Sequence, residues 1–143
     1  MLQPQAARKQ IDMRVLLIED DSATAQSIEL MLKSESFNAY TTDLGEEGVD
    51  LGKLYDYDII LLDLNLPDMS GIDILRRVKE NKFLKSTPVV VLTTTDDSQE
   101  VKRCYELGCN VYVTKPVNYE SFANAVRQLG LFFSVIQVPP AAI

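Results

Sequence analysis

Short apolar runs recur along the chain with helix-like segments between them, and this alternation restricts the folds open to it. The runs lack the polar alternation of a half-exposed strand, so they suit strands buried on both faces. Such strands, separated by helices at this spacing, predict one parallel sheet covered by helices on both sides. The expected strands are Val15–Ile18, Phe37–Thr41, Tyr57–Leu62, Val89–Leu92 and Val111–Val113, and the run at Phe37–Thr41 is the weakest.

The segments between these runs carry apolar residues at helical spacing. Ser22 is the expected N-cap of the first helix, and Gly108 is the expected stop of the fourth. The second helix is the weakest, because Gly48 and Gly52 each cost about 1 kcal/mol relative to Ala. The chain thus predicts an α/β fold, a doubly wound five-stranded parallel sheet of order 2-1-3-4-5. The later helices are expected over Glu46–Leu54, Gly71–Asn81, Ser98–Leu107 and Tyr119–Phe133.

Length and charge limit what the chain can do. Its 143 residues suit one domain, expected over residues 13–134 between a flexible leader (1–12) and a tail (135–143). The formal charge of −7 argues against nucleic-acid binding, which needs clustered Lys and Arg. The chain has no histidine, which removes a common general base and zinc ligand and excludes it as a phosphohistidine donor.

Neither export nor membrane insertion is indicated by the sequence. The leader lacks the apolar core of a signal peptide, and no run of 18 apolar residues occurs. Cys104 and Cys109 lack the CxxC spacing of a metal site and are too few for a disulfide framework. We therefore expect a cytoplasmic protein with reduced, structural thiols.

Polar residues follow the expected strands at the point where each strand ends. In a sheet of order 2-1-3-4-5, ligands bind at the carboxyl ends of the strands, near the switch point between strands 1 and 3. The sheet order therefore predicts one crevice containing acids, hydroxyls and an ammonium group. The residues at the four strand ends are Glu19, Asp20 and Asp21; Asp63; Thr93, Thr94 and Thr95; and Thr114 and Lys115.

An acidic cluster of this kind predicts a metal ion. Two carboxylates about 4 Å apart repel by about 4 kcal/mol at an effective dielectric of 20, and oxygen ligands suit Mg²⁺. Aspartate can also attack phosphorus to form an acyl phosphate, with Mg²⁺ and a lysine offsetting the phosphoryl charge. The expected direct ligands are Asp20 and Asp63, with the Asn65 carbonyl as a further ligand and Glu19 holding a metal-bound water. Lys115 and Thr93 would contact the phosphoryl group.

Each of these residues also has a structural interpretation. Asp20 and Asp21 would cap the helix that begins at Ser22, and Asp63 would open the turn at Pro67. Thr93 would be an ordinary strand end and Lys115 a solvated surface charge. Their joint placement at four strand ends favours the functional interpretation.

Four motifs carry a family resemblance: "VLLIEDDS", "LLDLNLPDMSG", "PVVVLTTT" and "VYVTKP". Over Met13–Phe133 the chain resembles the receiver domain of two-component response regulators, with a flavodoxin-like (βα)5 fold. The resemblance implies that Asp63 accepts a phosphoryl group from a histidine kinase or a small phosphodonor, using Mg²⁺. It also implies a switch formed by Thr93 and Tyr112 and a cis bond between Lys115 and Pro116.

The two halves of the chain resemble two different groups of response regulators. Residues 13–71 resemble the receiver of the cell-cycle master transcription regulator, whereas residues 87–140 resemble stand-alone response regulators that partner phytochrome photoreceptor kinases. A recombined or engineered chain would combine the two. After Phe133 ten residues remain, too few for an output fold, so we expect a stand-alone regulator without a DNA-binding output. The apolar end "LGLFFSVIQVPP" predicts a homodimer through the last helix and tail, the alternative being that it packs under the domain.

The expected protein is not an enzyme beyond its own aspartyl phosphorylation and dephosphorylation. A haloacid-dehalogenase-like phosphatase is an alternative, but it needs a second acid where Asn65 stands. A flavodoxin-like FMN carrier would dock a phosphate where this chain has "EDDSAT", with three acids. The third alternative is a degenerate receiver that serves as a dimeric scaffold.

Overall fold

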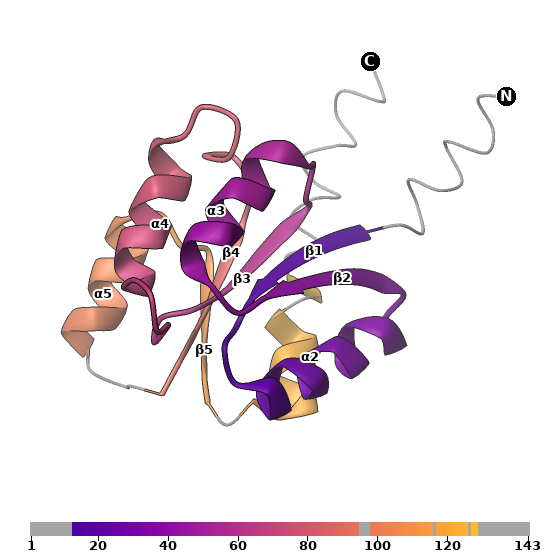
Figure 1. Cartoon of the computed structure of the whole chain (residues 1–143). Helices are drawn as coiled ribbons and strands as arrows, with labels where there is room; N and C mark the ends of the chain where they lie inside the picture. The colour runs from indigo at the N-terminus through magenta and orange to yellow at the C-terminus, as the bar shows by residue number, and fades with distance from the viewer. Residues whose placement is uncertain (1–12, 95–97, 116, 126, 129–143) are drawn as a thin grey trace, which may run out of the picture.

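The chain folds into one parallel sheet with helices on both faces (Figure 1). The structure, a computed structural model, describes residues 13–94, 98–115, 117–125, 127 and 128. The five strands follow the order β2-β1-β3-β4-β5, so the predicted topology is confirmed. The strands are β1 (Met13–Ile18), β2 (Phe37–Thr42), β3 (Ile59–Asp63), β4 (Val89–Thr93) and β5 (Val111–Thr114).

The helices divide between the two faces of the sheet, and alternate strand residues point to each (Figure 1). Leu17 packs in the cluster beneath α2 and the C-terminal helical segment 119–125, whereas Leu16 packs in the cluster beneath the other three helices. The two clusters form the core, and β3 and β4 are buried along their whole length. The labelled helices are α2 (Ser22–Ser34), α3 (Gly45–Leu54), α4 (Gly71–Glu80) and α5 (Ser98–Glu106).

The strand register brings the carboxyl ends of four strands to one edge of the sheet. Ile18 at the end of β1 pairs with Leu62, one residue before Asp63. Further along, Thr93 at the end of β4 pairs with Thr114 at the end of β5. Side chains that follow these strands therefore meet at one edge, as the sheet order predicted.

The start of α2 differs by one residue from the prediction. Asp21, not Ser22, is the N-cap, because its carboxylate accepts hydrogen bonds from the backbone N–H and hydroxyl of Thr24. These bonds hold the pKa of Asp21 below its ordinary value. The capping interpretation was thus right for Asp21, and Ser22 is the first helical residue.

Helix α3 forms although it contains three glycines. A Cβ on Gly48 would lie 2.5 Å from Cδ1 of Ile18, and one on Gly45 would lie 2.3 Å from Cδ1 of Ile74. The missing side chains therefore let α3 approach both β1 and α4 closely. The intrinsic cost of glycine in a helix is offset here by packing that a larger residue would block.

The burial of residues in the later helices is observed for only part of the chain. In α5, Cys104 is the buried residue, whereas Tyr105 is 46% exposed. Phe122, in the expected last helix, is buried. Three predictions lie outside the described residues. They concern Thr95, the Lys115–Pro116 bond, and the leader (1–12) and C-terminal end (129–143), including the expected dimer contact. Within the described part of the chain, no helix is long and apolar enough to cross a membrane.

Candidate functional site

Three carboxylates meet at the carboxyl edge of the sheet. Glu19 and Asp20 follow β1, Asp63 ends the adjoining β3, and one oxygen from each lies within 4.8 Å of the other two. Glu19 and Asp63 are only 2% and 1% exposed, whereas Asp20 is exposed. The sequence therefore predicted the meeting of these acids correctly.

Lys115 bridges the two buried carboxylates. Its Nζ lies 2.8 Å from Oε1 of Glu19 and 3.3 Å from Oδ1 of Asp63. Burial alone would lower the pKa of this lysine, but the hydrogen bond to Glu19 and the charge of Asp63 outweigh burial and raise it. The backbone also fixes its position, because the N–H of Lys115 donates to the carbonyl of Thr93 over 2.7 Å. Lys115 is thus part of the cluster, and its interpretation as a solvated surface charge is wrong.

The environment of Asp63 disfavours its charged form. Burial raises the pKa of its carboxyl group above the ordinary 3.8, and Glu19 raises it further. The N–H of Asn65, which donates to Asp63 Oδ1 over 3.0 Å, and the charge of Lys115 act in the opposite direction. The net result is a raised pKa, mainly because burial disfavours the charged carboxylate.

The other two acids have different surroundings. Glu19 is held by the N–H of Asp21, which donates to its Oε2 over 3.1 Å. Partial burial raises the pKa of Asp20, and contact with Asp63 raises it further. Since Asp20 is exposed and Glu19 is not, Asp20 is the acid of the pair that solvent reaches directly.

Two predicted site residues occupy β4 and β5. Thr93 is 1% exposed, and it ends the strand that pairs with β3. Tyr112 is partly buried, with its ring edge-on to Tyr105 at 6.0 Å between centroids. The amide of Asn65 donates to the hydroxyl of the exposed Thr94 over 3.4 Å. Thr93 therefore lies at the same edge as the acids.

The donor set fits a small divalent cation. Three carboxylates within 4.8 Å carry more negative charge than the single ammonium group of Lys115 can balance. Oxygen ligands of this kind are preferred by Mg²⁺, which characteristically uses one or two carboxylates and keeps several waters. Glu19, Asp20 and Asp63 are the residues able to supply them.

One residue near the site was not singled out from the sequence. Asp68, in the loop that follows Asp63, accepts the backbone N–H groups of Gly45 and Glu46. The available signal was Leu44, which stands at the N-cap of α3 without a capping side chain. A helix start of this kind needs an acceptor from elsewhere in the fold.

The sequence is similar to those of known proteins. The sequence profile described as "Response regulator receiver domain" matches residues 15–127. The cell cycle transcriptional regulator CtrA of Caulobacter vibrioides is 64% identical over 104 residues, which cover 73% of this chain and 44% of CtrA. The chain thus spans less than half the length of this curated relative. The likeness also extends beyond the stretch 13–71 from which it was predicted.

Solved structures agree with the observed fold. A response regulator receiver domain from Rhodospirillum rubrum is 49% identical, with a TM-score of 0.71, over 87% of this chain and 95% of that one. The receiver domain of the sensor histidine kinase PA1611 from Pseudomonas aeruginosa PAO1, solved with a magnesium ion in its active-site cleft, is 25% identical. Its TM-score is 0.76, over 83% of this chain and 98% of that one. By the profile match and the geometry together, this chain belongs to the response regulator receiver domain family.

Proposed function

We propose that this receiver domain accepts a phosphoryl group on Asp63 and thereby changes a surface that a partner recognises. The observation that carries the proposal is the lysine bridge: Lys115 Nζ lies 3.3 Å from Asp63 Oδ1 and 2.8 Å from Glu19 Oε1. A buried aspartate beside an ammonium group and two further acids is suited to a charged phosphoryl group brought in with a cation.

The proposed transfer uses the two oxygens of Asp63 differently. Oδ1 already accepts the N–H of Asn65 and faces Lys115, so we assign the attack on phosphorus to Oδ2. A P–O bond forms to Oδ2 while the P–N bond of the phosphohistidine on a histidine kinase breaks, and the released imidazole takes up a proton. Lys115 and the hydroxyl of Thr93 then contact the phosphoryl oxygens.

The proposed metal ligands are Asp20, Asp63 and the Asn65 carbonyl, with Glu19 acting through a water. A bound Mg²⁺ would supply charge stabilisation for the phosphoryl oxygens. The cluster of oxygens within 4.8 Å supports this assignment, as does the magnesium ion in the related PA1611 receiver. Between transfers, the chain's own residues hold the site: Lys115 pairs the buried acids and Asn65 orients Asp63.

The proposed output is a shift between two arrangements of the domain. Thr93 would turn toward the new phosphoryl oxygens, and Tyr112 would move inward from its present partly buried position. The surface formed by α5, β5 and the segment from residue 119 would report the change. Such a domain catalyses only its own phosphorylation and dephosphorylation, in the cytoplasm.

Two finer assignments stay predictions. These are a phytochrome kinase as the donor and a homodimer through the last helix and tail. Light scattering at micromolar concentration tests the homodimer, which a monomeric mass would exclude. Phosphotransfer profiling against candidate kinases, with a phytochrome kinase included, tests the donor.

The acceptor is tested by intact-protein mass spectrometry after incubation with acetyl phosphate and Mg²⁺. The wild type should gain one phosphoryl group, and Asp63→Asn should gain none. Asp73→Asn, which changes an exposed acid in the first turn of α4, is the matched control and should behave as the wild type does. Phosphorylation of Asp63→Asn would disprove the acceptor.

The rival functions give different results in the same experiment. A phosphatase would turn over a phosphomonoester such as p-nitrophenyl phosphate many times per molecule. A degenerate scaffold would gain no phosphoryl group in the wild type. An FMN carrier would show flavin absorbance after purification or after reconstitution with FMN.

A further inference from the structure

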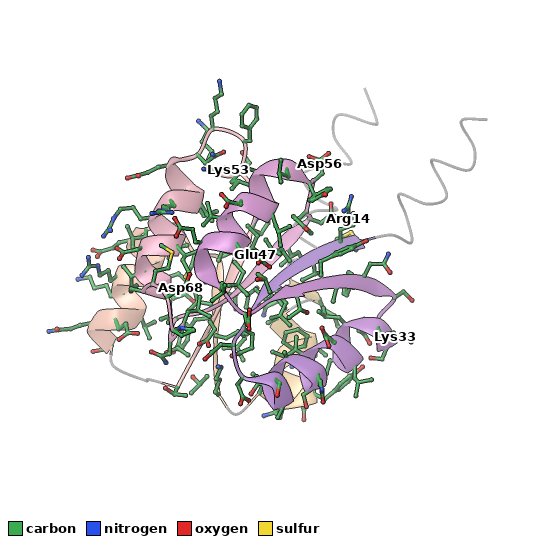
Figure 2. All side chains as sticks on the ribbon, viewed as in Figure 1. Arg14, Lys33, Glu47, Lys53, Asp56 and Asp68 are labelled. Carbon is green, nitrogen blue, oxygen red and sulfur yellow. The ribbon has the colours of Figure 1, made fainter. Side chains whose placement is uncertain are left out.

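Helix α3 receives its N-terminal cap from a distant part of the chain. Leu44 occupies the N-cap position without a side-chain hydrogen bond. Instead, Oδ1 of Asp68 accepts the N–H of Gly45 over 2.9 Å, and Oδ2 accepts the N–H of Glu46 over 3.1 Å. Figure 2 shows Asp68 beside the first turn of α3. The two N–H groups lower the pKa of Asp68, which keeps it ionised and bound.

The loop that carries Asp68 begins at the proposed phosphoryl acceptor and is fixed at its base. The N–H of Gly71 donates to the carbonyl of Leu64 over 3.0 Å, and Asn65 and Ser70 form an antiparallel bridge. Gly71 also lies so close to the chain that a Cβ there would be 2.4 Å from Cα of Leu64. The base of residues 64–70 is thus held by backbone bonds, and the outer part of the loop by the packing of Leu66 and Met69 against the core and by the polar contact of Asp68 with α3.

The start of α3 is tied in turn to Glu19. The N–H of Glu19 donates to the carbonyl of Thr42 over 3.0 Å, and the hydroxyl of Thr42 accepts the N–H of Leu44 over 3.3 Å. Asp68 therefore completes a path from Glu19 to Asp63 that runs through hydrogen bonds to the start of α3 and then along the backbone of the loop. Hydrogen bonds join Glu19 to Thr42, Thr42 to Leu44, Gly45 to Asp68, and Asn65 to Asp63, and the backbone connects these pairs.

We infer that Asp68 is a positioning residue for the cation site: it holds the loop, and with it the Asn65 carbonyl, against the mutual repulsion of the three acids. The inference rests on the proposed function and deepens it. Without this tie the loop keeps its backbone bonds and apolar packing but loses its polar contact with α3. Repulsion among three carboxylates, which one lysine does not balance, can then shift the Asn65 carbonyl away from Glu19. Outer residues that orient metal ligands typically change metal affinity by about 10- to 100-fold when they are replaced.

The competing interpretation is that Asp68 only stabilises α3. Loss of an N-cap typically costs about 1 kcal/mol of stability, which by itself would not alter a folded site. The two interpretations separate if α3 is given a local cap. Leu44 is well placed for this, because it has the extended backbone of an N-cap residue and is 41% exposed.

The test compares Mg²⁺ affinity, by isothermal titration calorimetry, in four proteins: wild type, Asp68→Ala, Asp73→Ala and the double variant Leu44→Ser/Asp68→Ala. Asp73→Ala removes an equal charge from an exposed position in the first turn of α4 and controls for net charge. Thermal unfolding of each protein is recorded in parallel. We expect Asp68→Ala to bind Mg²⁺ about tenfold more weakly than Asp73→Ala does.

The double variant decides between positioning and capping. We expect it to regain much of the thermal stability while its Mg²⁺ affinity stays low. Recovery of affinity together with stability, or equal affinities in Asp68→Ala and Asp73→Ala, would overturn the inference while leaving the proposed function in place. Failure of the wild type to bind Mg²⁺ would overturn both.

Discussion

Replacing the proposed phosphoryl acceptor should make the metal-free protein more stable. Asp63→Asn keeps the shape of the side chain, and the amide oxygen can still accept the N–H of Asn65. The change removes a carboxylate that is 1% exposed and that lies within 4.8 Å of two other acids. Since burial and Glu19 both raise the pKa of Asp63, its ionised form costs the folded protein free energy at neutral pH.

The size of the change in stability follows from the distances between the charged groups. At an effective dielectric of 20, the repulsion between Asp63 and Glu19, whose oxygens lie within 4.8 Å of each other, is at least about 3.5 kcal/mol, and that with the exposed Asp20 is roughly half as large because of solvent screening. The lost attraction to Lys115 at 3.3 Å is about 5 kcal/mol, so these charge terms nearly cancel. Dehydration of the buried carboxylate, which costs several kcal/mol, decides the sign. We expect a net gain of about 2 kcal/mol.

Bound Mg²⁺ should make the wild type the more stable of the two proteins. A ligand at 100 times its dissociation constant stabilises the folded state by about 2.7 kcal/mol, and Asp63→Asn lacks one of the proposed metal ligands. The assay is urea unfolding at pH 7, once with EDTA and once with saturating Mg²⁺, with Asp73→Asn as the exposed control. The reasoning is refuted if Asp63→Asn is the less stable protein in EDTA, or if Mg²⁺ stabilises both proteins equally.

The same pair of proteins has a defined pH dependence in EDTA. A raised pKa in the folded state means that Asp63 binds its proton more tightly there than in the unfolded chain. The stabilisation from this proton is complete below pH 3.8, the ordinary value, and is lost as pH rises through the folded-state pKa. The stability of the wild type relative to Asp63→Asn should therefore fall as pH rises above 3.8. A difference that rises over this range would contradict the raised pKa.

Three further predictions concern the surroundings of the site. Lys115→Met leaves two buried carboxylates without their cation and should cost about 3 kcal/mol in urea unfolding at pH 7 with EDTA. Gly71→Ala should cost about 2 kcal/mol of stability, because its Cβ would lie 2.4 Å from the backbone of Leu64. Gly52→Ala should cost less in the same assay, because the nearest atom to its Cβ, at 3.3 Å, belongs to a side chain. Burial raises the pKa of the Cys109 thiol to about 12, so iodoacetamide at pH 8 should alkylate it in urea but not in the native protein, as followed by mass spectrometry.

The position of the site could be predicted because it depends on strand ends. A strand buried on both faces is apolar throughout, without the alternation of polar and apolar residues seen in a half-exposed strand. In agreement, β3 is buried from Ile59 to Asp63, as the apolar run implied. Parallel register then places the residue after each run at the same edge. Sheet order and strand length are therefore enough to predict that Asp20, Asp63 and Lys115 lie at one edge of the sheet.

Contacts between loops and helix ends could not be predicted in this way. The first helix offered both Asp21 and Ser22 as caps, and side-chain reach to Thr24 selected the aspartate. Asp68 stands 23 residues from Gly45, whose N–H it accepts, and no local pattern links them. Such pairs are set by how α3 and the loop after β3 pack, which the sequence does not display residue by residue.

Strand pairing holds Glu19 and Asp63 close together, although their charges repel each other. Leu62, one residue before Asp63, is paired with Ile18, one residue before Glu19, so the two acids cannot separate without breaking the ladder between β1 and β3. Lys115 relieves only part of their repulsion, since its ammonium group is shared between them. Folding therefore creates an electrostatic cost that a divalent cation can remove. On this reasoning, cation affinity and metal-free stability should change in opposite directions when an acid of the cluster is neutralised, whereas loss of Asp68 should lower both.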